Sequence, residues 1–253
     1  MARSTFLARL CKGLSAIGLI CAATTALAQA PAQDAPKNLQ VLPKDWTRPQ
    51  VVAVMQNINA ALGVGCDHCH VVPQGAPPDF ASDDKPEKKF ARAMMKMTQG
   101  INTTLKTDLT PIRQQSFDVT CYTCHHGNRL PETLEHALTT ELAKEGVDST
   151  VALYRSLRAD FYGRAAYDFG EWSLVSVAEN LSRDPAQAGA AIALLNENLV
   201  HYPESAGTYA RLGETYLVKG DTTTAMTQFD KATALAPDDP WLKRRVERLK
   251  GKK

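Results

Sequence analysis

The chain reads Cys66-Asp67-His68-Cys69-His70 and, further on, Cys121-Tyr122-Thr123-Cys124-His125. Both stretches follow the pattern Cys-x-x-Cys-His, the attachment signature of a c-type haem. Each thiol adds to one vinyl group of the porphyrin, and the two residues between the thiols let a single turn present both sulfurs to one edge of the ring. The histidine that follows lies under the ring and supplies one axial ligand of the iron. The sequence therefore predicts two covalently bound haem c groups, with these residues as attachment sites and axial ligands: Cys66, Cys69, Cys121, Cys124, His70 and His125.

Paired cysteines also occur in thioredoxin-like redox sites, in zinc sites with four thiolates and in disulfides. A redox pair does not require a histidine directly after its second cysteine. A zinc ribbon separates its two pairs by about 15–20 residues, many fewer than lie between Cys69 and Cys121. Two independent disulfides stay open as an alternative, but only haem attachment explains the histidine in both copies.

The composition of the 253-residue chain is that of a soluble globular protein, and its length suits one large or two small domains. The formal net charge of +2 offers no basic surface of the kind that binds nucleic acid. We therefore expect no nucleic-acid partner.

Residues 1–28 have the composition of an export signal. Basic residues come first, an apolar stretch over residues 14–27 follows, and Ala26-Leu27-Ala28 fits a cleavage site. The apolar stretch is shorter than the roughly 20 residues that span a bilayer, so membrane association is not predicted, and a retained anchor facing the periplasm is the alternative. Cleavage removes Cys11 and Cys21, which leaves only the cysteines of the two motifs. We expect a periplasmic protein with a linker over residues 29–40.

The segment before the first motif is predicted to be a helix over residues 48–62. Thr47 is a good N-cap, Gln50 completes a capping box, and Gly63 ends the helix. Met55 lies on its apolar face, where a thioether could reach the second axial position of the iron opposite His70. Apolar spacing alone is more typical of a methionine that fills the core.

A second helix is predicted before the second motif, capped at Asp84, with a linker through Pro111 after it. Both Met94 and Met97 fall on its apolar face, and spacing does not choose between them as ligand of the second iron. His68 and His126 are expected on the surface. The apolar face comprises Phe90, Met94, Met97, Ile101 and Leu105.

Residues 38–131 resemble the cytochrome c subunit of photosynthetic reaction centres. The resemblance rests on the order of helix, glycine-rich turn and motif, on Ala91-Arg92-Ala93-Met94 and Ile101-Asn102, and on the run Val119-Thr120-Cys121-Tyr122-Thr123-Cys124-His125-His126-Gly127. In that family the axial methionine comes from the helix before each motif. The resemblance therefore implies Met55 and Met94 as axial ligands, with Met97 as the alternative to Met94.

The sequence also departs from that family. The reaction-centre subunits carry four haems, and one of their irons takes a histidine from the linker. Here only two motifs occur, and residues 107–120 contain no histidine. A four-haem electron pathway is therefore excluded, and the resemblance indicates the chemistry more firmly than the redox partner.

Residues 132–253 lack cysteine and are predicted to form helical repeats. Pro203 and Pro237 are one tetratricopeptide period of 34 residues apart, and a capping helix is expected over residues 241–249. Such a stack binds a peptide or protein on its concave face, or it serves only as a scaffold that covers the haem domain. The repeat pattern is carried by these residues: Tyr209, Leu212, Gly213, Tyr216, Gly220, Ala225, Phe229, Ala232, Leu235 and Pro237.

The expected fold is all-α, with a di-haem cytochrome c domain over residues 41–131 followed by a tetratricopeptide-like solenoid. The expected function is one-electron transfer to and from redox partner proteins. Iron that is ligated by histidine and methionine has no free position for a substrate, and methionine raises its potential. The alternatives are a peroxidase-like haem enzyme with one open haem, and an interaction protein that senses redox state.

Overall fold

The structure is a computed structural model that describes residues 35–113 and 117–251. The predicted export signal and the first half of the predicted linker lie outside the described residues. Helices joined by turns and loops account for the regular structure of the described part, and its only β-type pairing is an isolated bridge between Val71 and Asp79. The all-α prediction is confirmed. None of the helices described has both the length and the apolar composition that crossing a membrane requires.

The predicted first helix is present as α1 (Arg48–Leu62). The backbone N–H and the hydroxyl of Thr47 both lie 2.8 Å from Gln50 Oε1, so the expected capping interaction forms. Gly63 ends the helix with a φ of 68°, a left-handed conformation that glycine adopts at little cost. The helix therefore starts and stops on signals within a few residues of its ends.

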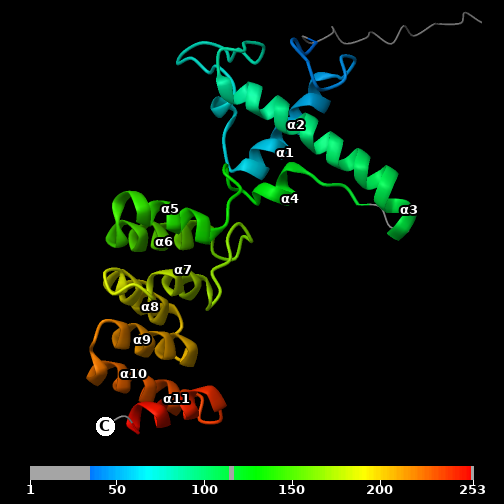
Figure 1. The fold of residues 1–253 in the computed structure, drawn as a ribbon. Coiled ribbons are helices and arrows are strands. Elements are labelled where there is room, and N and C mark those ends of the chain that lie inside the picture. Colours follow the sequence, from blue (N-terminus) through cyan, green and yellow to red (C-terminus); the bar gives the residue numbers. More distant parts are fainter. Residues whose placement is uncertain (1–34, 114–116, 252–253) are drawn as a thin grey trace, which may run out of the picture. The chain divides into compact units, whose positions relative to one another are not determined.

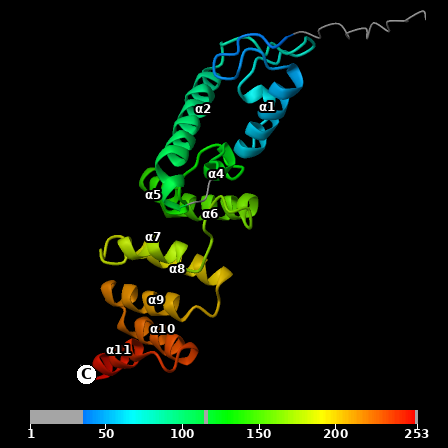
Figure 2. The ribbon, with the colours of Figure 1, turned by 90° about the vertical axis from the view of Figure 1, so that its right-hand side faces the viewer.

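A close backbone contact joins the end of α1 to the residues after the second motif. The Gly127 N–H donates a hydrogen bond of 2.8 Å to the Ala61 carbonyl. A Cβ atom at Gly63 would lie 2.2 Å from the Gly127 carbonyl oxygen, so the contact requires a glycine at position 63. Figure 2 shows the helix of the second motif, α4 (Cys121–His125), beside this end of α1.

The second predicted helix is α2 (Pro86–Thr104), and two details of the prediction are wrong. Its N-cap residue is Lys85 rather than Asp84, and no side-chain cap is formed there. The expected linker through Pro111 is also partly helical, because α2 continues through a π-turn, η2 (Leu105–Leu109), into α3 (Thr110–Arg113). Proline has no N–H to donate, and the wider hydrogen bonding directly before it lets the helix pass this position.

An ion-pair cluster fastens the loop of residues 79–83 to α2. We call Asn38, Asp83, Lys88 and Arg92 the Asp83 cluster. Asp83 Oδ1 lies 2.8 Å from Arg92 and 3.2 Å from Lys88, and the Asn38 amide donates to it at 2.9 Å. The buried Lys88 ammonium also donates to the carbonyls of Phe80, Ala81 and Ser82. Hydrogen bonds from Arg92, and then from Asn38, hold the pKa of Asp83 well below its usual range.

The C-terminal helices pack one on the next in a layered stack (Figure 1). The capping helix predicted over residues 241–249 lies within α11. That the helix pairs are tetratricopeptide repeats stays a prediction. The helices of the stack are α5 (Leu134–Glu145), α6 (Val147–Phe161), α7 (Ser173–Leu181), α8 (Ala188–His201), α9 (Ala206–Val218), α10 (Thr222–Leu235) and α11 (Pro240–Lys250).

The stack has its own hydrophobic core. Tyr154, Leu174 and Leu195 are fully buried between α6, α7 and α8. At α9, a Cβ atom on Gly213 would come within 2.8 Å of the Phe229 ring on α10. Because Gly213 has no side chain, α9 and α10 can approach each other closely at this position.

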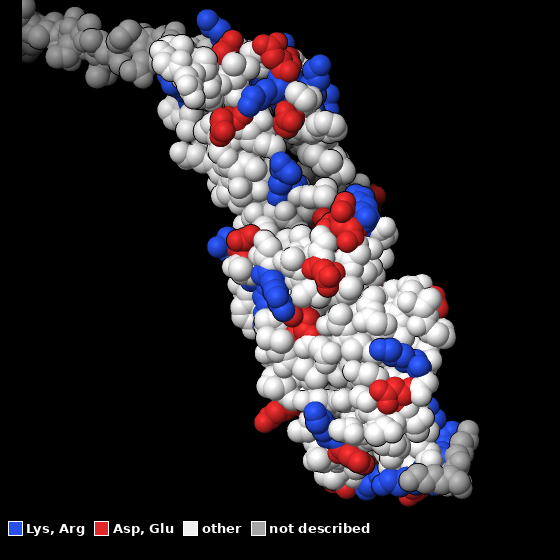
Figure 3. All heavy atoms as spheres, turned by 90° about the vertical axis from the view of Figure 1, so that its left-hand side faces the viewer, with Lys and Arg blue, Asp and Glu red and all other residues white. Residues whose placement is uncertain are grey.

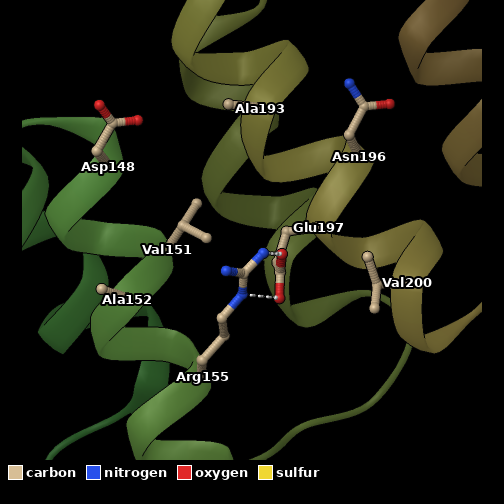
Figure 4. A pocket seen from close by; sticks show the side chains of 8 residues that line it. All are labelled: Asp148, Val151, Ala152, Arg155, Ala193, Asn196, Glu197 and Val200. Carbon is tan, nitrogen blue, oxygen red and sulfur yellow. Dashed lines mark hydrogen bonds and ion pairs between the residues drawn. The ribbon is translucent and has the colours of Figure 1, made fainter.

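Ion pairs add specific links between helices of the stack. Glu197 of α8 is 3% exposed, and Arg155 of α6 binds both of its carboxylate oxygens, at 3.0 and 2.6 Å (Figure 4). Arg245 of α11 binds Glu214 of α9 in the same two-pronged way. A buried carboxylate is stable only when it is paired. On the outer face drawn in Figure 3, acidic and basic side chains are interspersed, in keeping with the small net charge.

We expect Gly63→Ala to destabilise the protein more than Gly75→Ala. Both glycines have positive φ, so each alanine costs about 1–2 kcal/mol for its left-handed backbone. A Cβ at Gly75 meets nothing within 4 Å, whereas at Gly63 it collides with the Gly127 carbonyl, which adds about 1–3 kcal/mol. Urea unfolding of the two variants, followed by circular dichroism, measures the difference. Equal losses would show that the contact between Gly63 and Gly127 contributes nothing.

The stability that Asp83 contributes should depend on pH. Its pKa is lower in the folded than in the unfolded chain, so the contribution is complete above the ordinary value of 3.8 and is lost as the pH falls below it. The difference in urea midpoint between wild type and Asp83→Asn should therefore be constant near neutral pH and shrink in acid. Asp84→Asn is the matched control, because the structure gives Asp84 no ion pair among the described residues. A difference that stays constant down to about pH 3 would contradict the assignment.

Candidate haem-binding site

The first motif begins in a 3₁₀ turn, η1 (Cys66–His68), directly after the glycines that end α1. The His70 N–H donates to the Cys66 carbonyl at 3.0 Å, which closes the motif into a compact turn. The Asn59 amide of α1 lies 3.5 Å from Cys66 Sγ. Cys66 is exposed, Cys69 is half-buried, and both thiols are free. The two sulfurs of this motif are therefore accessible for thioether formation.

The His70 ring lies against the loop that the Asp83 cluster fastens. The ring centroids of His70 and Phe80 are 5.2 Å apart in an edge-to-face arrangement. The His70 Nδ1 atom is buried and has no hydrogen-bond partner among the described residues. Burial, and then the nearby Lys88 ammonium, lower the pKa of His70, against an opposing effect of the Phe80 carbonyl. Neutral imidazole is the form that binds a metal ion.

The second motif forms α4, a short helix held from both sides. The Thr120 N–H donates to Thr123 Oγ1 at 3.0 Å at the start of α4. The side chain of Asn102 on α2 makes two hydrogen bonds to Val119, to its carbonyl at 2.8 Å and from its N–H at 2.7 Å. Helix α2 therefore positions the residues that lead into the motif, which gives a structural role to an asparagine that the resemblance singled out.

One hydrogen bond determines which ring nitrogen carries the proton in neutral His125. Its Nδ1 atom lies 2.9 Å from the Asn128 backbone carbonyl. A carbonyl oxygen only accepts hydrogen bonds, so Nδ1 is the donor and Nε2 keeps its lone pair. This is the arrangement that a metal-binding histidine requires.

A hollow of about 900 Å³ brings the second motif together with the predicted methionines of α2. Met94, Met97 and His125 all line it, and the ligation of iron by either methionine stays a prediction. His136 of α5 lines the same hollow, and the sequence analysis did not single it out because it lies in the first helix after the predicted cytochrome domain of residues 41–131. The lining residues are Met94, Met97, Cys124, His125, Leu130, Pro131, Glu132, Thr133 and His136.

Three further residues singled out in the sequence are Met55, His68 and His126, and all three are half-buried. Met55 is half-buried on α1, about two turns before the glycines that precede the first motif. His68 and His126, expected on the surface, are half-buried instead. His126 ends α4 with a φ of 49° and packs edge-on against Tyr122, with ring centroids 5.6 Å apart.

The described residues fit haem c, because the polypeptide before residue 132 leaves its apolar faces uncovered. In that part, Ala61 is the only buried hydrophobic side chain. Phe90, Met94, Met97 and Ile101, which we call the α2 apolar stripe, are 69%, 45%, 52% and 38% exposed. A helix with an apolar stripe normally buries it. The porphyrin faces provide the apolar surface that these side chains require, and the free thiols and the His125 tautomer supply the attachment chemistry.

Comparison with known proteins agrees with this chemistry. Residues 18–160 match the model of the family described as photosynthetic reaction centre cytochrome C subunit. Cytochrome c-554 of Chloroflexus aurantiacus is 37% identical over 99 residues, which cover 39% of this chain and 22% of that protein.

Two relatives are themselves described as photosynthetic reaction center cytochrome c subunits. That of Rubrivivax gelatinosus is 36% identical over 70 residues, covering 28% of this chain and 16% of the relative. That of Thermochromatium tepidum is 33% identical over 98 residues, which cover 38% of this chain and 22% of the relative. The aligned residues thus span about a fifth of each of these three relatives. Because the family model matches more than half of the chain, the chain belongs to the photosynthetic reaction centre cytochrome c subunit family, and membership implies covalently bound haem c.

Proposed function

We propose that the chain is an exported cytochrome with two haem c groups that passes single electrons between redox partner proteins. The observation that carries the proposal is the hollow that joins Cys124 and His125 of the second motif to the thioethers of Met94 and Met97. The Nδ1 atom of His125 is bonded to a backbone carbonyl, which leaves Nε2 of the neutral ring free to bind iron. Haem c, when bound, supplies a one-electron couple. The first motif has the same chemistry and its own methionine upstream.

Each residue type has a defined part in this proposal. The cysteines at positions 66, 69, 121 and 124 hold the two groups covalently, so that they stay bound in both oxidation states. His70 and His125 provide one axial ligand each. Met55 and Met94 provide the opposite ligands, with Met97 as the alternative to Met94. A filled axial position keeps water and small ligands from the metal, which suits outer-sphere electron transfer.

We further propose that residues 41–131 form the cytochrome domain and that the helices after residue 132 dock a redox partner. Their layered packing and separate core support a stable binding surface. Charges are interspersed over the face drawn in Figure 3, so recognition there would rest on local contacts rather than on one large charged area. Attachment of haem c outside the bacterial cytoplasm supports a periplasmic location.

Intact mass measurement tests the two-haem proposal. Protein matured in a host that attaches haem c should carry the added mass of two porphyrins. The double variant Cys66→Ala/Cys69→Ala and the double variant Cys121→Ala/Cys124→Ala should each carry one. Bare polypeptide in the wild type would overturn the proposed function and favour a thiol or zinc protein instead.

Single methionine variants test the axial ligands. Met55→Ala and Met94→Ala should each keep both haems by mass but open one iron, so that the reduced protein binds about one equivalent of carbon monoxide where the wild type binds little. Met95→Ala is the matched control on α2, because Met95 falls beside the apolar stripe.

The same titration decides among the donors around the second haem. Binding by Met97→Ala with none by Met94→Ala would move the ligand to Met97. Binding by His136→Ala alone would assign that position to His136. If the wild type itself binds one equivalent, one haem is open and the peroxidase-like alternative is favoured.

A further inference from the structure

A tyrosine beyond the residues matched by the family model contacts the loop directly after the second motif. The Tyr167 hydroxyl oxygen accepts a hydrogen bond of 2.7 Å from the Asn128 side-chain amide. Asn128 is also the residue whose backbone carbonyl accepts the Nδ1 proton of His125 at 2.9 Å. Two consecutive contacts therefore connect Tyr167 to the proposed iron ligand. The family model ends at residue 160.

Asn128 is fixed at several points, so its carbonyl has a defined direction. Its N–H donates to the His125 carbonyl at 2.7 Å. Its side-chain oxygen lies 3.3 Å from the Leu130 N–H, and its side-chain nitrogen donates to Tyr167. The Tyr167 contact is the one that reaches outside the loop. Loss of that contact would leave the loop to local hydrogen bonds alone.

Tyr167 is itself held in a packed aromatic cluster. Its ring lies edge-on to Phe161 at 5.4 Å and to Phe169 at 6.0 Å between centroids. Phe169 is buried and packs against Tyr154, and Arg158 donates to its carbonyl at 3.2 Å. Burial raises the pKa of the Tyr167 hydroxyl, so it remains neutral at physiological pH. The hydroxyl that meets Asn128 is therefore positioned by the core of the helical stack.

The two proposed iron ligands, His70 and His125, differ in the hydrogen bonding of their Nδ1 atoms. His125 Nδ1 donates to a carbonyl, whereas His70 Nδ1 is buried without a partner among the described residues. A hydrogen bond from Nδ1 makes an imidazole a stronger donor to its metal. A stronger donor stabilises the ferric state and lowers the reduction potential. The first motif is therefore an internal reference for any change at the second.

We propose that Tyr167 is a positioning residue for His125, through which the C-terminal helices set the reduction potential of the second haem. The inference rests on the proposed function, because it assumes His125 as an axial ligand. The inference goes beyond the proposed function, because it assigns the segment after residue 160 a part in tuning one of the two haems. A partner that binds the stack near Phe161 and Phe169 would then act on one haem and leave the other unchanged.

Tyr167→Phe tests the proposal with the complete two-haem protein. The variant loses the hydroxyl and keeps the ring that packs in the cluster. In an optical redox titration we expect one midpoint potential to rise and the other to stay at its wild-type value. Tyr162→Phe is the matched control, because Tyr162 lies in the same loop, is 62% exposed, and its hydroxyl has no hydrogen bond within the described part of the chain. That control should leave both potentials unchanged.

A second variant tests the path through Asn128. Asn128→Ser keeps the backbone carbonyl and removes the amide that reaches Tyr167, so it should raise the same potential. Combined with Tyr167→Phe it should shift that potential no further than the larger single effect, because both changes break one path. Additive shifts would show that the two residues act separately. Asn128→Ser also tests the proposal if Tyr167→Phe fails to fold.

The outcomes separate this inference from the proposed function. Wild-type protein with two haems whose potentials are unaffected by Tyr167→Phe would overturn only the inference. Equal shifts of both potentials would also overturn it, because they would indicate general loosening of the fold. Protein that carries no haem would overturn the proposed function and the inference together. In the Cys66→Ala/Cys69→Ala background, the rise on Tyr167→Phe should persist in the single remaining haem.

Discussion

Within the described part of the chain, no other element covers the α2 apolar stripe, and this constraint shapes the segment before residue 132. Ala61 is the only buried hydrophobic side chain described there, although two well-formed helices run through the segment. Helices with one apolar face are stable in water when that face is covered. Two porphyrins attached at the motifs would cover it, so in this reading the cofactors complete the hydrophobic core as well as carrying the electrons.

Polar contacts and close backbone approaches, rather than a hydrophobic core, hold the elements of this segment together. The Asp83 cluster fastens the loop beside His70, Asn102 fixes the residues that lead into α4, and Gly63 meets Gly127 at the junction of the two motifs. These contacts place the two motifs in different surroundings. The Asp83 cluster places two cations near His70, while His125 is bound to a backbone carbonyl. Two motifs of the same Cys-x-x-Cys-His pattern are thus expected to give haems with different potentials.

The helices after residue 132 are held together by a hydrophobic core instead. They bury large apolar side chains and pair their few buried charges, as Glu197 with Arg155 shows. A rigid stack of this kind suits a binding surface, and Tyr167 gives it one contact with the loop of the second motif. Electron transfer and partner recognition would then be connected through one tyrosine and one asparagine.

The sequence by itself determined the features that depend on neighbours a few residues apart. These are the two attachment motifs, the start and end of α1, the apolar face of α2, and the regular helices after residue 132. Local signals failed where more than one rule applied. The proline at position 111 predicted a break, but a π-turn before it lets the helix continue.

Only the tertiary structure decided which distant residues meet. Gly63 and Gly127, Asn102 and Val119, Asn128 and Tyr167, and the grouping of His136 with Met94 and Met97 all join residues far apart in the chain. No periodicity or spacing encodes such contacts. They arise when separate helices are packed together, because only packing fixes the positions of side chains that the sequence keeps apart.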